Sequence, residues 1–167
     1  MVMNNFYRLV LSFSLCYGVA FAGALYTLPM IPFWYAALKK PEFIPPDPVF
    51  IPLGLFGAFL LSIALYFLWS SDPSLREDTK TALYLFLFGL ALSFLWFYAF
   101  FGLQSPFLAL LIMIMLIAIF LSTIFLAVHV SIPAAVALVP YFIGCLVLLI
   151  VNYYLYIMNP NLPILVM

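Results

Sequence analysis

Charged residues are scarce in this chain. Its 167 residues include five Lys and Arg, five Asp and Glu and one His, so 6% of the chain is charged and the formal net charge is zero. It has no basic run of the kind that binds nucleic acid or an anionic lipid surface. With 69% hydrophobic residues and a mean hydropathy of +1.32, too little polar surface remains to coat a water-soluble globule. The composition therefore predicts an integral membrane protein that does not bind nucleic acid.

Cysteine and histidine are also rare. Cys16 and Cys145 each stand alone in an apolar run, so neither a redox motif nor a disulfide framework is indicated, and we expect buried thiols. The single histidine, His129, lies at the end of an apolar run, where a polar group favours a helix C-terminus. No other ligand type is close to it in sequence, and we expect no metal site.

Motifs of enzymes and ion pumps are missing as well. The patterns H-x-E, H-E-x-x-H, G-x-S-x-G and G-x-G-x-x-G do not occur. No acidic or basic residue falls at mid-depth of an apolar run, where a proton relay would need one. We therefore expect no enzyme activity and no ion pumping by a carboxylate relay.

What the chain does contain is five long apolar runs. One span needs about 20 apolar residues to cross roughly 30 Å of hydrocarbon. The sequence predicts one domain, residues 1–167, that is an all-α bundle of five transmembrane helices with spans at about 6–28, 49–69, 75–103, 106–128 and 133–158. The first span is expected to stop before Pro29 and Pro32. A cleaved signal peptide is the competing interpretation of the N-terminus, because Arg8, an apolar stretch and Ala20 to Ala22 have that pattern.

Helix start signals precede three of these spans. Ser74 and Glu77 form an S-x-x-E capping box at the start of the third span. Ser105 followed by Pro106 is typical of an N-cap and first helical residue, and Ser131 repeats this signal for the fifth span. The basic residues divide three to two between the two membrane sides, so the orientation stays open.

Small residues four apart indicate where helices pack closely in lipid. Such stripes occur in the first three spans, at Ser14, Gly18 and Ala22, at Gly54, Ala58 and Ser62, and at Gly89 and Ser93. Contacts within one bundle are the favoured interpretation, and contacts between protomers are the other.

The last span carries unusual polar and proline residues. Asn152 and Asn159 are seven apart and so share one helix face, where an asparagine usually bonds to a neighbouring helix. Pro140 removes one backbone hydrogen bond, which either serves packing or opens the helix beside a ligand.

A charged, proline-rich segment lies between the first two spans. The stretch WYAALKKPEFIPPDPVF, residues 34–50, holds Lys39, Lys40, Glu42 and Asp47 in a chain that has few other charges. By composition alone it is a polar loop between two spans.

Three blocks of the sequence resemble the TspO/MBR family. Residues 34–50 are similar to its W-Y-x-x-L-x-K-P-x-W-x-P-P-x-x-V-F, and LSFLWFYAFFG is similar to its L-N-x-x-W-x-x-x-F-F-G. LVPYFIGCLVLLIVNYYLYIMN is similar to its P-Y-x-x-W ending with L-N and a final N. The order of the blocks and the five spans agree with the family.

The resemblance implies a five-helix bundle, commonly dimeric, with a cavity that binds porphyrins and other flat apolar ligands under a lid formed by the first loop. The resemblance also implies that the protein requires no cofactor and that the possible ligand is a porphyrin or haem-like tetrapyrrole. By motif position, the implied ligand-binding residues are Trp34, Tyr35, Phe50, Gly54, Ser93, Trp96, Tyr141, Gly144 and Leu148, and the implied lid residues are Lys40, Pro41, Pro45 and Pro46.

Departures from the family pattern concern the walls of that cavity. Gly54 and Gly144 stand where the family has tryptophans, Ser93 replaces an asparagine, and Phe43 replaces the tryptophan of K-P-x-W. Each missing indole would have buried roughly 150 to 250 Å². The cavity is therefore expected to be larger, or to be filled by neighbouring phenylalanines.

These observations predict a membrane-embedded binding protein, a sensor or carrier of porphyrins or other flat apolar molecules. The alternatives are a structural or assembly protein whose cavity is filled, and a transporter of lipid or porphyrin. The expected partners are membrane lipid, a small apolar ligand and a second copy of the chain. The expected location is a prokaryotic plasma membrane, with the chain as a multi-pass protein.

Overall fold

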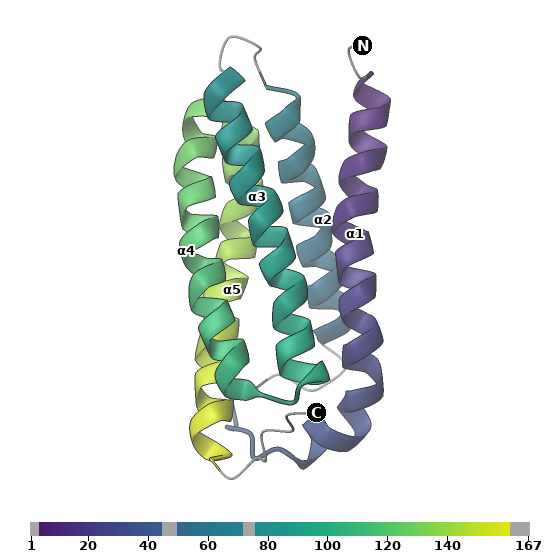
Figure 1. Ribbon diagram of the computed structural model, residues 1–167, viewed down its shortest axis with the longest axis vertical. Helices are drawn as coiled ribbons and strands as arrows, with labels where there is room; N and C mark the ends of the chain where they lie inside the picture. Colours follow the sequence, from purple (N-terminus) through teal and green to yellow (C-terminus); the bar gives the residue numbers. More distant parts are fainter. Residues whose placement is uncertain (1–3, 45–49, 72–75, 161–167) are drawn as a thin grey trace.

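The computed structural model describes residues 4–44, 50–71 and 76–160, except the side chains of Phe50 and Arg76. These residues form five long helices (Figure 1), namely α1 (Asn5–Met30), α2 (Phe50–Trp69), α3 (Arg76–Phe97), α4 (Pro106–Val130) and α5 (Ile132–Met158). Two π-helical turns follow α1 and α3, namely η1 (Ile31–Tyr35) and η4 (Tyr98–Gly102). All five helices are long and apolar enough to cross a membrane. The prediction of an all-α bundle with five spans is confirmed.

The helices form a closed ring. Going round the bundle, neighbours follow in the order α1, α2, α5, α4, α3, and α3 contacts α1 again. Short connections make consecutive helices antiparallel, so the segment after α1, the turn between α3 and α4 and the end of α5 meet at one end, which is the lower end in Figure 1. We call this the lid end, and residues 38–44 the lid loop.

The first helix does not stop at the prolines, so that part of the sequence prediction is wrong. Helical structure continues through Pro29 and η1, and the first span extends from Asn5 to Tyr35. Pro29 and Pro32 lack N–H donors, and the wider π turn lets the Ala36 N–H reach the Ile31 carbonyl. Trp34 and Tyr35 consequently lie on the helix and not in the loop.

The caps predicted from the sequence for α3, α4 and α5 are observed only in part. The Ser105 hydroxyl accepts a hydrogen bond from the Leu108 N–H at 3.3 Å, as expected of an N-cap. Ser131 occupies the N-cap position of α5, but no capping bond of its side chain occurs in the described structure. The capping box of Ser74 and Glu77 falls partly on Ser74, which lies outside the described residues.

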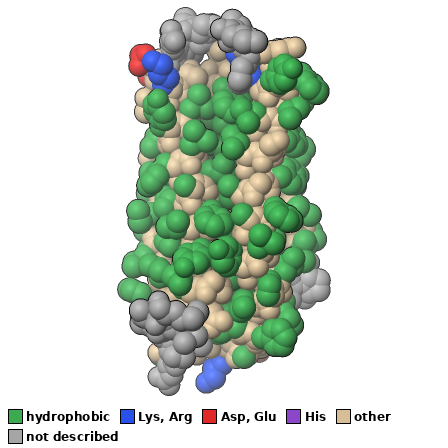
Figure 2. Space-filling model, turned by 45° about the vertical axis from the view of Figure 1, so that its right-hand side comes forward, with side chains coloured by type: hydrophobic (Ala, Val, Ile, Leu, Met, Phe, Trp, Pro, Cys, Tyr) green, Lys and Arg blue, Asp and Glu red, His purple; other side chains and the backbone are tan. Residues whose placement is uncertain are grey.

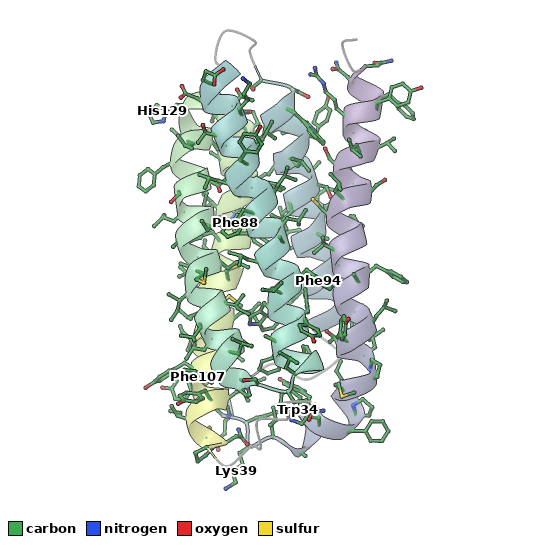
Figure 3. All side chains as sticks on the ribbon, in the orientation of Figure 1. Trp34, Lys39, Phe88, Phe94, Phe107 and His129 are labelled. Carbon is green, nitrogen blue, oxygen red and sulfur yellow. The ribbon has the colours of Figure 1, made fainter. Side chains whose placement is uncertain are left out.

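The charged side chains on the described surface lie at the two ends of the bundle (Figure 2). Lys80 pairs with Glu77 at 2.8 Å at one end, and Lys39 lies at the other (Figure 3). His129 is exposed at the end opposite the lid loop, with Nδ1 3.0 Å from the Phe125 carbonyl of the preceding turn. Between the ends the visible surface is largely apolar, as lipid requires.

Two of the three small-residue stripes pack inside the bundle. Ala58 and Ser62 of α2 and Gly89 and Ser93 of α3 are buried. At Gly89 an added Cβ would lie 3.0 Å from the Phe120 ring of α4, so a larger residue would require this ring to shift.

The stripe on α1 faces outward instead. Ser14 and Gly18 are exposed, and an added Cβ at Gly18 would meet no described atom within 4 Å. The favoured interpretation, contact within the bundle, is therefore wrong for this stripe. Contact between protomers remains a prediction for it.

A buried hydrogen bond joins α1 to α2. Ser12 is fully buried, and its hydroxyl oxygen accepts a hydrogen bond from the Trp69 indole N–H at 3.0 Å. We expect Ser12→Ala to lower the free energy of unfolding by about 1 kcal/mol, because the indole N–H loses its partner. Thermal unfolding in detergent measures this loss. Ser14→Ala, two residues away on the exposed face, is the matched control, and equal melting of the two variants would contradict the prediction.

Candidate functional site at the lid end

Five aromatic rings from η1, α3 and η4 pack together near the lid end. The Trp34 ring meets the Phe100 ring edge to face at 5.2 Å between centroids, and Trp96 stacks on Phe100 at 5.4 Å. Tyr35 and Phe101 complete this aromatic cluster at 6.1 Å from each other. Consecutive residues normally point to different sides of a helix, but the wide π turn brings both Phe100 and Phe101 inside, where both are buried.

A buried asparagine ties this cluster to α4 and α5. The Asn152 side-chain oxygen accepts a hydrogen bond from the Trp96 indole N–H at 3.0 Å, and its amide donates to the Pro106 carbonyl at 2.8 Å. Asn152 is 1% exposed. The predicted role of an asparagine that bonds to neighbouring helices is therefore observed for Asn152, and it fixes the orientation of the Trp96 ring.

Tyr141 lies further from the lid, at the centre of the bundle. Its hydroxyl is 3.1 Å from the Ser93 hydroxyl of α3, and its ring is 5.0 Å from the Phe120 ring of α4. On the side of α2, an added Cβ at Gly57 would be 3.4 Å from the Tyr141 ring. Tyr141 thus touches three neighbouring helices and closes the interior at this level. Helix α5 continues through Pro140, which is exposed.

Open space lies beside Gly54, one turn closer to the lid end. Gly54 lies on the same face of α2 as Ala58, Leu61 and Leu65, because these positions follow at spacings of four, three and four. Those three residues are buried, with exposures of 4%, 4% and 0%. Gly54 is exposed although it faces the same way, and a Cβ added there would meet nothing within 4 Å in the described part of the chain.

Gly144 lies at the same level on α5. The contact between Gly57 and Tyr141 sets the register of α2 against α5, and these helices are antiparallel neighbours. One turn towards the lid from this contact are Gly54 on α2 and Gly144 on α5. Gly144 is also exposed, and no described atom lies within 4 Å of its Cβ position. We call this space the open site.

The lid loop is attached to α5 over the end of the bundle. The Asn159 side chain accepts a hydrogen bond from the Lys39 N–H at 2.9 Å and donates one to the Lys39 carbonyl at 3.0 Å. Phe43 packs edge to face on Tyr154 at 5.3 Å between ring centroids. The loop is therefore a cover held to the last two turns of α5.

The other lid and wall residues expected from the sequence are distributed as follows. Lys40 places its ammonium group 3.9 Å from the centroid of the Tyr35 ring, a cation–π contact. Pro41 and Leu148 are half-buried. Pro45 and Pro46 lie outside the described residues, as does the side chain of Phe50. The structure thus brings Trp34, Tyr35 and Trp96 into one cluster, and it places Ser93 and Tyr141 in a second group.

Two features of the site were not predicted from the sequence. Phe100 and Phe101 belong to the block LSFLWFYAFFG, of which only Ser93 and Trp96 were predicted to contact the ligand, and a π turn has no clear sequence signal. Asn159 was expected to bond to a neighbouring helix, but it bonds to Lys39, 120 positions away. The proximity of the lid motif to the end of α5 depends on the folded ring.

The chemistry of the site is that of rings and a few neutral polar groups. No group of three His, Cys, Asp or Glu side chains that could hold a metal ion occurs within the described residues. The polar groups of the aromatic cluster and of the group of Tyr141, Ser93 and Phe120 are neutral, namely hydroxyl groups, indole N–H groups and the buried amide of Asn152. Such surroundings suit an apolar molecule with few hydrogen-bonding groups.

A bundle of five helices, each long and apolar enough to cross a membrane, defines a multi-pass membrane protein, and the family to which it belongs supports a membrane sensor or binding protein. Comparison with known proteins identifies the family. A family model described as the TspO/MBR family matches residues 12–158, and the chain belongs to this family. It is 33% identical over 156 residues to a tryptophan-rich protein TspO of Archaeoglobus fulgidus, covering 93% of this chain and 99% of that protein. It is 36% identical over 134 residues to a tryptophan-rich protein TspO of Chlorobaculum tepidum, covering 80% and 84%. The resemblance found in the sequence is confirmed.

Proposed function

We propose that this protein binds a flat, largely apolar macrocycle, of which a porphyrin is the chemical type, in the open site beneath the lid loop. One observation supports this most directly. Gly54 points the same way as buried residues of α2, yet a side chain there would meet no described atom within 4 Å. The other residues on this face of α2 are buried, so the open space beside Gly54 is room for a ligand next to the packed part of the bundle.

The surroundings of the open site favour this class of ligand. Trp34, Trp96 and Phe100 on one side and Tyr141 with Phe120 on the other offer ring faces and edges. Each aromatic contact contributes roughly 0.5 to 1.5 kcal/mol beyond the apolar area it buries. A structural protein with a filled cavity is less well supported, because neither Gly54 nor Gly144 has a phenylalanine among the described atoms within 4 Å of its Cβ position.

Titration with protoporphyrin IX tests the proposal. We expect saturable quenching of tryptophan fluorescence at micromolar ligand in the purified protein. The chain has three tryptophans. Trp34 and Trp96 are in the aromatic cluster, whereas Trp69 ends α2 at the opposite end of the bundle. Trp96→Phe and Trp34→Phe should therefore each remove more of the quenching than Trp69→Phe, which serves as the control.

Two results of this titration would count against the proposal. Quenching that rises linearly with ligand up to high concentration would indicate partition into the detergent or lipid. Quenching that depends mainly on Trp69 would place the ligand at the wrong end of the bundle.

A further inference from the structure

Asn159 makes a two-point contact with the backbone of the lid loop. Its Oδ1 accepts from the Lys39 N–H at 2.9 Å, and its Nδ2 donates to the Lys39 carbonyl at 3.0 Å and to the Leu155 carbonyl at 2.9 Å. Exchanging the amide oxygen and nitrogen would place donor against donor and acceptor against acceptor, so the three bonds together define the orientation of the amide. The amide of Asn159 thus bonds to both the N–H and the carbonyl of Lys39, as the backbone of a neighbouring β-strand would.

The position of Asn159 makes this contact important for the cover. It is the C-cap residue of α5, and its bond to the Leu155 carbonyl holds the side chain on the helix end. On the loop side, Lys39 lies between Leu38, which is buried, and Lys40, whose ammonium group stands over the Tyr35 ring. Lifting the loop from the bundle end therefore requires that the bonds to Asn159 break.

The ring contact between the loop and α5 is less directional than these hydrogen bonds. Phe43 packs on Tyr154 with its ring edge, and both side chains remain exposed. Such a ring contact can slide, whereas two hydrogen bonds to one residue fix both position and direction. The contact of Asn159 with Lys39 fixes where this part of the loop crosses the end of α5.

We propose that Asn159 is a positioning residue that keeps residues 38–44 closed over the end of the bundle. By keeping this segment closed, Asn159 slows the exchange of a ligand in the open site. The part of this proposal that concerns ligand exchange rests on the proposed binding function. The part that concerns closure of the loop does not. The net contribution of two hydrogen bonds corresponds to about tenfold in the equilibrium between closed and open loop.

Hydrogen exchange of the full-length protein in nanodiscs tests the closure directly. We expect Asn159→Leu, which removes all three bonds, to speed deuterium uptake of the whole segment 38–44 by about tenfold. Asn159→Asp keeps an acceptor for the Lys39 N–H but loses both donated bonds, so an intermediate effect is expected. Asn4→Ala is the control, because Asn4 caps α1 at the opposite end.

The number of amides that exchange faster shows whether Asn159 holds the whole segment 38–44 or only Lys39. If only the Lys39 amide exchanges faster in Asn159→Leu and the rest of the segment is unchanged, the proposal is wrong. The melting temperature of each variant is measured in parallel, because loss of global stability would speed exchange in all five helices and not in this segment alone.

Release of protoporphyrin IX to excess serum albumin, followed by stopped flow, tests the role in exchange. We expect Asn159→Leu to speed both association and release by about tenfold, so that the dissociation constant changes less than either rate. Release at the wild-type rate, in a variant whose loop exchanges faster, would overturn that role. If the wild-type protein binds no porphyrin, the binding proposal fails, and the hydrogen-exchange result still decides whether Asn159 closes the loop.

Discussion

Leucine in place of Gly54 will weaken the binding of protoporphyrin IX by about tenfold or more, equivalent to about 1.4 kcal/mol. The leucine side chain would enter the open site, where no described atom now lies within 4 Å of the Cβ position. A ligand that uses this space loses its contacts on the side of α2 or must shift against the aromatic cluster. Gly144→Leu should act in the same way from the side of α5. Fluorescence titration of each variant gives the dissociation constants.

Gly18→Leu is the matched control for these variants. Gly18 also has no described atom within 4 Å of its Cβ position, but it lies on the exposed face of α1. All three substitutions replace a helical glycine whose added Cβ meets no described atom within 4 Å, so we expect the fold to tolerate each of them. If Gly54→Leu and Gly18→Leu bind porphyrin as tightly as the wild type, the ligand does not occupy the open site.

Leucine in place of Asn152 will lower the free energy of unfolding by about 2 to 3 kcal/mol. The asparagine is 1% exposed and accepts a bond from the Trp96 indole while it donates to the Pro106 carbonyl. Leucine has a similar volume but leaves both of these partners without a hydrogen bond inside the bundle. Thermal and denaturant unfolding in detergent measure the loss.

A double substitution separates the two bonds. Trp96→Phe removes the indole N–H, so Asn152→Leu should cost less free energy in that background than in the wild type. Equal costs in the two backgrounds would show that the bond from Trp96 to Asn152 adds no stability. The same cycle, carried out with bound porphyrin, reports whether the orientation of the Trp96 ring affects affinity.

Much of the fold was predictable from residue patterns. The number of spans follows from apolar runs long enough to cross lipid, and Ser105 with Pro106 marked the start of α4 as observed. The end of the first span was predicted wrongly, because Pro29 and Pro32 usually end a helix. Here a π turn accommodates them and carries the helix to Tyr35.

The candidate site was predictable in its residues more than in its arrangement. Trp34, Tyr35 and Trp96 were expected together and do meet in one cluster. The contribution of Phe100 and Phe101 depends on η4, since a regular α turn would point the two rings to different sides. A sequence pattern does not report such a local change of helix type.

The sequence by itself determined that this protein lies in the membrane, that it has five spans and that it belongs to its family, because each of these depends on composition, run length or motifs along the chain. Only the tertiary structure decided whether the space beside Gly54 and Gly144 is open and what the side chain of Asn159 holds. Both depend on which helices are neighbours in the ring and on their register, and these are set by contacts between residues far apart in sequence.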